Sequence, residues 1–180
     1  MGVRRRQKSL ETRKAEHAQI SDPSLVLEAA LRFLEARHRS AAEVRRRLLL
    51  HGYRADLIDG AIARLIDLAI IDDAAFAQAW VESRDRARPR GERALRRELA
   101  AKGVDRETVD GAIEERDAVA PDADADAARR LLERNARVLT RVPDPRARRQ
   151  RAYALLARNG FDSELAMSSV RAWEQAQAQA

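Results

Sequence analysis

The chain has 180 residues, no Cys, and a formal net charge of +6 from 35 Lys and Arg against 29 Asp and Glu. The lack of Cys excludes disulfides and thiolate metal sites, which suits a reducing cytoplasm, and no apolar run approaches the ~20 residues of a membrane span. Aromatic residues make up only 4% of the chain, so we expect small, local cores of Leu, Ile and Val.

The first predicted elements are a basic tail and two helices. Residues 1–22 hold many charges and few large apolar side chains, so they are expected to be flexible, with some transient helix. A helix is predicted from Pro23, a residue favoured in a first turn, with one face formed by Leu27, Leu31 and Leu34. Ser40 is the predicted N-cap of the next helix, Glu43 completes a capping box, and Gly52 ends that helix.

Seven further helices are predicted after Gly52. The first of them ends near Leu68, and Asp72 or Asp73 caps the next, which contains Phe76. The acidic, Ala-rich residues 117–126 are predicted to be a short linker that runs into a helix start. The other five helices are indicated by apolar residues at helical spacing: Leu95 and Leu99; Val109 and Ile113; Leu131, Leu132, Val138 and Leu139; Tyr153 and Leu156; Leu165, Val170 and Trp173.

Three segments align on a glycine that ends a helix. Gly52, Gly103 and Gly160 each follow a Leu by four positions and directly precede another apolar residue. Repetition at intervals of about 50 residues is typical of tandem repeats. The sequence therefore predicts an all-α protein with three tandem three-helix repeats, 23–70, 71–117 and 118–180, that form an elongated, curved body. The alternative is a compact globule of nine helices with accidental similarity.

Three motifs resemble those of the RecX family, in the same order and spacing. The first is Glu43–Leu48 followed by Gly52 and Tyr53; the second is Ile71–Ala77; the third is Arg88–Gly91 followed by Leu95, Glu98, Leu99, Lys102 and Gly103. His51 stands where the family has Lys, and the third repeat lacks the Glu-Leu pair. The residues expected to maintain the motifs are Gly52, Tyr53, Asp72, Asp73, Phe76, Gly91, Gly103 and Gly160.

The resemblance implies a regulator, not an enzyme, that needs no cofactor. RecX proteins bind along the groove of the RecA nucleoprotein filament and limit its ATPase, recombinase and co-protease activities in DNA recombination, DNA repair and the SOS response. We expect a cytoplasmic monomer with the RecA filament as partner and no membrane association. The alternatives are a stand-alone helical module that binds single-stranded or double-stranded DNA, and a helical scaffold for another acidic protein.

The candidate interface residues are basic. Arg45 and Arg46 align with Arg96 and Arg97 when the repeats are superposed on their glycines, so equivalent pairs would form a stripe that grips phosphates or an acidic groove. Solvated helix faces are the alternative, and no metal or catalytic site is expected. The candidate partner or nucleic-acid contacts are Arg45, Arg46, Arg47, Arg88, Arg90, Arg93, Arg96, Arg97 and Lys102.

Overall fold

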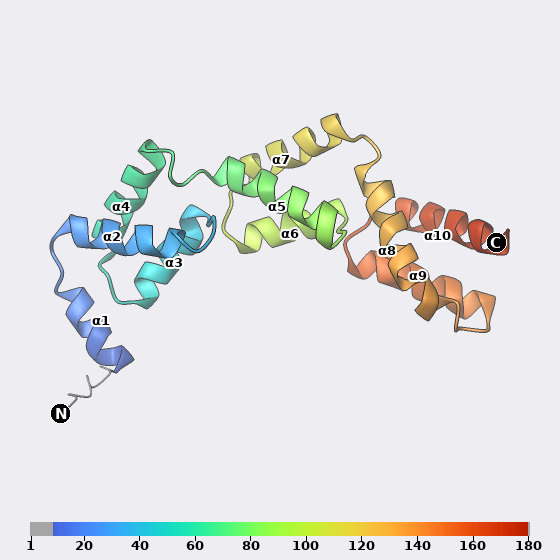
Figure 1. Cartoon of the computed structure of the whole chain (residues 1–180), viewed down its shortest axis with the longest axis horizontal. Coiled ribbons are helices and arrows are strands. Elements are labelled where there is room, and N and C mark those ends of the chain that lie inside the picture. The colour runs from blue at the N-terminus through green and yellow to red at the C-terminus, as the bar shows by residue number, and fades with distance from the viewer. Residues whose placement is uncertain (1–8, 180) are drawn as a thin grey trace, which may run out of the picture. The chain divides into compact units, whose positions relative to one another are not determined.

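The computed structural model describes residues 9–179, and within this range it consists of helices and connecting turns without any strand (Figure 1). None of these helices has the length and apolar character that crossing a bilayer requires. The expected all-α class is confirmed. The helices are α1 (Leu10–Ala18), α2 (Pro23–Leu34), α3 (Ala41–Leu50), α4 (Ala55–Asp67), α5 (Asp73–Ala87), α6 (Glu92–Ala101), α7 (Arg106–Val119), α8 (Ala123–Leu139), α9 (Pro145–Arg158) and α10 (Ser163–Ala178).

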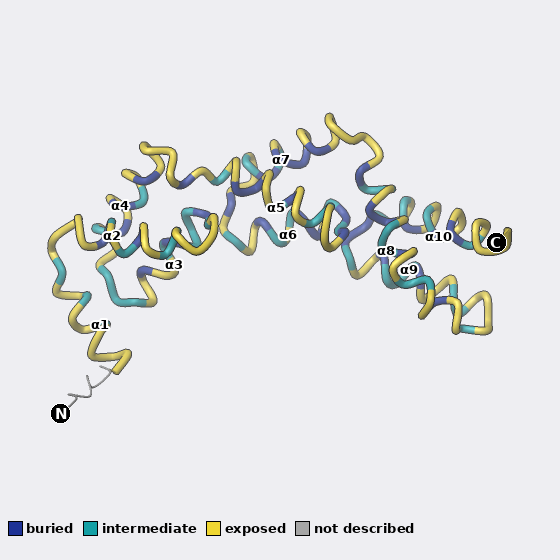
Figure 2. The backbone as a smooth tube through the Cα atoms, viewed as in Figure 1, coloured by how far each residue is buried: buried dark blue, intermediate teal, exposed yellow. Residues whose placement is uncertain are grey.

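The chain divides into two compact units, one running up to Phe76 with Lys102–Val104 added, the other made of Ala77–Ala101 and the residues from Asp105 onward. In the first unit, α2, α3 and α4 enclose a small apolar core, and Figure 2 shows buried stretches of backbone on these helices in dark blue. The buried face of α2 is centred on Val26 and Ala30, whereas Leu31 is 36% exposed. The core side chains are Val26, Ala30, Val44, Leu48, Ile58, Ala61, Leu65 and Ile71.

In the second unit, α8, α9 and α10 form a three-helix group around Leu132, Leu156 and Phe161. The segment 117–126 runs into a helix start as predicted, since α8 begins at Ala123, but its non-helical part is short because α7 continues to Val119. Two acidic residues of that segment, Asp124 and Asp126, lie in the first turn of α8, where carboxylates interact favourably with the helix dipole.

Two helix starts follow the expected capping chemistry, with differences in detail. The Ser40 Oγ accepts a hydrogen bond from the Glu43 backbone N–H at 3.2 Å, and Asp72 Oδ1 accepts from the Ala75 N–H at 2.9 Å. Asp73 caps another helix: its Oδ1 accepts from the N–H of Ala41, the first residue of α3, at 2.9 Å. One acidic residue therefore caps α5 and its neighbour caps a helix of the preceding repeat.

The turns at two of the glycines contact the start of a helix from the preceding repeat. In the first unit, the carbonyl of Lys102 accepts a hydrogen bond from Ser40 Oγ at 2.7 Å, and a β-carbon on Gly103 would overlap the methyl group of Ala42. In the second unit, the Gly91 N–H donates to the carbonyl of Asn159 at 3.1 Å. We call each of these contacts the glycine joint, and its recurrence explains why the second helix of each of these repeats must be followed by Gly.

Helix α1 is a difference from the sequence expectation, because it lies within the segment expected to be a flexible tail. Its residue His17 stacks on the ring of Tyr53, with centroids 4.2 Å apart, and His17 Nδ1 donates to the carbonyl of His51 at 2.7 Å. A β-carbon on Gly52 would lie 2.7 Å from the carbonyl oxygen of Lys14. Helix α1 thus packs on Gly52 much as α3 packs on Gly103, a tertiary contact that local sequence does not reveal. Residues 1–8 of the predicted tail lie outside the described residues.

Packing of α1 is expected to weaken in mild acid. Burial lowers the pKa of His51, and the charges of Arg47, His17 and Arg13 act in the same direction. Because the folded pKa is depressed, this contribution to stability is complete above the ordinary pKa of 6.5 and is lost as the pH falls through the folded value. Hydrogen exchange of the α1 amides, corrected for the intrinsic rate, should show less protection at about pH 5.5 than at about pH 7.5. Equal protection at both values, or the same decline in a His51→Gln variant, would contradict this assignment.

Candidate partner and nucleic-acid interface

Two of the candidate arginines form equivalent ion pairs inside their own repeats. Arg45 on α3 pairs with Asp59 on α4, and Arg96 on α6 pairs with Asp110 on α7. In both repeats the Arg precedes the stop glycine, and the Asp follows it, by the same number of residues. We call this ion pair the clasp. Since it joins the second and third helices of a repeat, Arg45 and Arg96 have a structural role.

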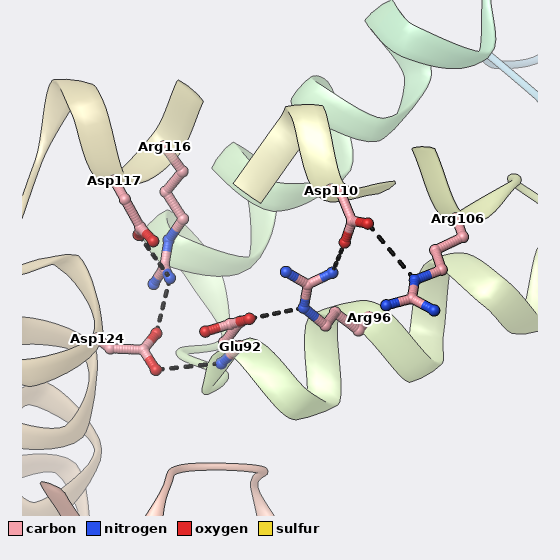
Figure 3. A network of polar contacts seen from close by, with 7 residues as sticks. All are labelled: Glu92, Arg96, Arg106, Asp110, Arg116, Asp117 and Asp124. Atoms are coloured by element: carbon pink, nitrogen blue, oxygen red, sulfur yellow. Dashed lines mark hydrogen bonds and ion pairs between the residues drawn. The ribbon is translucent and has the colours of Figure 1, made fainter. Parts of the chain in front are cut away.

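Arg96 is held from two sides (Figure 3). Its Nε donates to Glu92 Oε1 at 2.6 Å, one turn earlier on α6, while another guanidinium nitrogen pairs with Asp110. The hydrogen bond to Glu92, followed by that to Asp110, raises the pKa of Arg96. Asp110 also pairs with the exposed Arg106 at 3.6 Å. A phosphate or carboxylate of a partner would have to compete for Arg96 with the carboxylates of Glu92 and Asp110.

Glu98 contacts two further arginines and a tryptophan. Its Oε2 accepts hydrogen bonds from the indole N–H of Trp80 at 2.9 Å and from Arg84 Nε at 2.6 Å, and its Oε1 pairs with Arg90 at 3.2 Å. The Arg84 guanidinium also lies over the Trp80 ring, 4.2 Å from its centroid. Glu98 was not among the predicted site residues, although its place in the Glu-Leu pair of the third motif was a signal. The ion pair with Glu98 and a contact with Asn159 hold the Arg90 side chain within the protein.

Three other candidates take part in contacts at the glycine joints. Lys102 Nζ donates to Glu43 Oε1 at 3.0 Å, and Arg46 donates to the backbone carbonyl of Lys102 at 3.1 Å. Arg93 pairs with Asp162 at 2.6 Å. Burial favours the neutral acid at Glu43, but the hydrogen bond and charge of Lys102 outweigh it and lower the pKa of Glu43. The predicted capping box is thus incomplete, because Lys102 attracts the Glu43 carboxylate away from the helix start.

Arg47, Arg88 and Arg97 differ from the other candidates. Arg88 and Arg97 are exposed and have no hydrogen-bonding or ion-pair partner for their side chains within residues 9–179. Arg47 has no carboxylate partner in that range, and its guanidinium lies 5.3 Å from the centroid of the Phe33 ring. These three arginines are the candidates whose charge is available to another molecule.

Arg116 is a buried cation that sequence reasoning missed. Its guanidinium donates to Asp85 at 2.8 and 3.0 Å and to Asp124 at 2.7 Å, and Figure 3 shows the Asp124 side of this network. Its side chain is only 5% exposed. Burial opposes the charge, but the hydrogen bonds to both carboxylates outweigh it and raise the pKa of Arg116. Because Arg116 links α5, α7 and α8, no local pattern could have identified it.

The motif residues of the prediction occupy structural positions. Gly52, Gly103 and Gly160 have positive φ angles of 91°, 82° and 87°. Tyr53 donates its backbone N–H to the carbonyl of Leu48 at 3.2 Å, and Phe76 is 5% exposed. A β-carbon on Gly91 would lie 2.5 Å from the backbone nitrogen of Phe161. Among residues 9–179, no three or more His, Asp or Glu side chains gather as metal ligands.

Comparison with known families and structures agrees with this architecture. Three family models match in chain order: the first three-helix domain of RecX over residues 27–65, the second over 72–113 and the third over 122–168. The three-helix organisation predicted from the glycines is therefore confirmed. The crystal structure of RecX from Lactobacillus salivarius has the same fold, with a TM-score of 0.73 at 22% identity over 85% of this chain and 97% of that one.

Two relatives are more similar to this chain in sequence than the RecX of Lactobacillus salivarius is. The regulatory protein RecX of Mycobacterium avium (strain 104) is 37% identical over 155 residues, which cover 84% of this chain and 88% of the relative. The regulatory protein RecX of Thermobifida fusca (strain YX) is 35% identical over 141 residues, which cover 78% of this chain and 74% of the relative. The chain therefore belongs to the RecX family.

Proposed function

We propose that this protein is a cytoplasmic regulator that binds the RecA nucleoprotein filament and inhibits its ATPase, recombinase and co-protease activities. The observation that carries the proposal is membership of the RecX family across all three domains. Relatives that match most of the chain are named regulatory proteins. The charged clusters around Arg45, Arg96 and Arg116 form ion pairs that hold helices together, which supports a structural rather than a catalytic role for these side chains.

The pairing of the arginines narrows the proposed contact residues to a few. Six of the nine predicted cations have internal partners: Arg45, Arg46, Arg90, Arg93, Arg96 and Lys102. Arg47, Arg88 and Arg97 have no carboxylate partner within the described part of the chain. A guanidinium without a carboxylate partner binds phosphate or carboxylate without first breaking an internal ion pair. We assign these three residues the main share of the electrostatic contact.

Purified protein is expected to lower the ATPase rate of RecA on single-stranded DNA, and the triple variant Arg47→Ala, Arg88→Ala, Arg97→Ala should be a weaker inhibitor. If each exposed charge contact contributes about 0.5 kcal/mol, the half-inhibitory concentration should rise about tenfold. Steady-state ATP hydrolysis, measured over a titration of each protein, gives this ratio.

The control is the triple variant Arg64→Ala, Arg137→Ala, Arg158→Ala, which removes the same charge from exposed residues without side-chain partners in residues 9–179. It should inhibit like the wild type. No inhibition by stoichiometric wild-type protein would reject the proposed function, whereas equal losses in both triple variants would reject only the assignment of contact residues.

A stand-alone DNA-binding module is the second candidate function, supported by the exposed arginines and the net charge of +6. It predicts binding to labelled single-stranded or double-stranded oligonucleotides without RecA, with an affinity that falls steeply with salt because counterions are released from DNA. Fluorescence anisotropy at several salt concentrations tests it. Absent or salt-insensitive binding would leave the RecA filament as the favoured target.

A further inference from the structure

A groove of about 720 Å³ lies between α9 and α10 in the third three-helix domain. Tyr153 and Met167 contribute apolar surface to it, and Met167 is 46% exposed. Tyr153 is half-buried and packs against the core of α8–α10. The polar side chains that line the groove are Arg146, Arg149, Gln150 and Arg171.

The groove occupies the position of the clasp in the other two repeats. Tyr153 precedes Gly160, and Met167 follows it, by the same numbers of residues that separate Arg45 and Asp59 from Gly52. In the second repeat the equivalent residues are Arg96 and Asp110, which also form an ion pair. The third repeat therefore has two large apolar side chains where the first two have an Arg–Asp ion pair.

All the charged side chains that line the groove are positive. Its lining contains three arginines and no acidic residue. Arg149 pairs with Glu174, outside the lining, at 2.7 Å. Arg146 and Arg171 are exposed, and their side chains have no partner within residues 9–179. An apolar floor with unpaired guanidinium groups at its edge is complementary to an acidic ligand that carries apolar side chains.

We propose that this groove binds an acidic amphipathic helix of a partner protein. The apolar face of the helix lies on Tyr153 and Met167, and its carboxylates pair with Arg146 and Arg171. A groove between two helices fits a third helix, whose anchors recur every three or four residues. The thioether of Met167 adapts to different apolar side chains. Nucleic-acid bases stack on exposed aromatic planes, whereas the one aromatic ring in the lining, that of Tyr153, is half-buried against the core.

This proposal goes beyond inhibition of RecA and is tested without RecA. The probe is a fluorescein-labelled peptide of about 14 residues, about four helical turns, with Leu at helical spacing on one face and Glu elsewhere. We expect it to bind the full chain in fluorescence anisotropy, with an affinity that falls as the salt is raised from about 50 to about 300 mM. A peptide of the same composition, with the Leu residues scattered around the helix, should bind at least about tenfold more weakly.

Two variants of the groove test its assignment. The double variant Tyr153→Arg, Met167→Asp installs the clasp of the other repeats and should weaken binding at least about tenfold, because the apolar floor is lost. The double variant Arg146→Glu, Arg171→Glu should weaken binding to a similar extent while leaving the core side chains in place. The matched control Arg151→Glu, Arg158→Glu changes two exposed arginines of α9 outside the groove and should leave binding unchanged.

Failure of the wild type to bind the peptide, or equal binding by wild type and both groove variants, would overturn the proposal. A labelled oligo-dT strand is titrated in parallel. Oligo-dT binding that both groove variants lose, with no peptide binding, would overturn it in favour of a nucleic-acid site. The ATPase titration of the same preparations separates the two proposals, since inhibition of RecA without peptide binding rejects only the groove.

Discussion

A Gly160→Ala variant is expected to lose about 2–4 kcal/mol of its free energy of unfolding. Gly160 has a φ of 87°, a left-handed conformation in which a β-carbon clashes with the following carbonyl at a cost of about 1–2 kcal/mol. The new β-carbon would also lie 2.5 Å from the Cβ of Ala94 at the start of α6. Because this neighbour is a short side chain on helical backbone, the joint must separate to admit the methyl group.

Urea unfolding followed by circular dichroism measures this loss, and Gly111→Ala is the matched control. Gly111 lies inside α7, and a β-carbon there would meet no atom within 4 Å. The control should gain about 0.5–1 kcal/mol, because Ala restricts the unfolded chain and favours the helix. Similar unfolding midpoints for the two variants would show that the joint at Gly160 does not require glycine.

An Arg116→Ala variant should lose about 3–5 kcal/mol, the loss typical of removing one partner from a buried ion pair. The change leaves Asp85 and Asp124 facing each other without the guanidinium that donates to both. The two carboxylates then repel, and the space left by a side chain that was 5% exposed adds a packing defect. Because the three residues lie on different helices, the second compact unit should lose cooperativity in thermal unfolding.

Arg106→Ala is the control for this second prediction. Arg106 is 94% exposed, and its 3.6 Å ion pair with Asp110 lies in water, where such pairs contribute at most about 1 kcal/mol. The free energy of unfolding of the Arg106→Ala variant should differ from that of the wild type by less than about 0.5 kcal/mol. If Arg116→Ala were as mild as Arg106→Ala, the network around Arg116 would not stabilise the second unit.

The sequence predicted the features of this chain that depend on neighbouring residues. The stop glycines were identified because a left-handed residue between two helical patterns favours Gly. The capping role of Ser40 followed from its position just before a helical pattern, whereas the sequence left the cap of α5 open between Asp72 and Asp73, and the structure shows that Asp72 caps it. The apolar face predicted for α2 was right in part: Leu27 and Leu34 pack against the core, but Leu31 is exposed, and packing places Val26 and Ala30 at the centre of the buried face.

The candidate site was less predictable, because an arginine in a sequence does not reveal its partner. Arg90 contacts Asn159, Arg93 pairs with Asp162, and Lys102 pairs with Glu43; all of these pairs are distant in sequence. The alignment of Arg45 with Arg96 was a correct observation, but the shared position belongs to the clasp within each repeat. The expected stripe of equivalent arginine pairs is thus replaced, at those two positions, by ion pairs that hold helices together.

By itself, the sequence determined the helical class, the threefold repetition and the family motifs. Helical spacing, caps and stop glycines act over a few residues and are legible in order along the chain. The tertiary structure decided which cations are available to a partner, that α1 packs on Gly52, and that Tyr153 and Met167 leave a groove where the other repeats have a clasp. The physical reason is that charge pairing and packing depend on which helices meet in space, and the contacts that fix them join residues far apart in the chain.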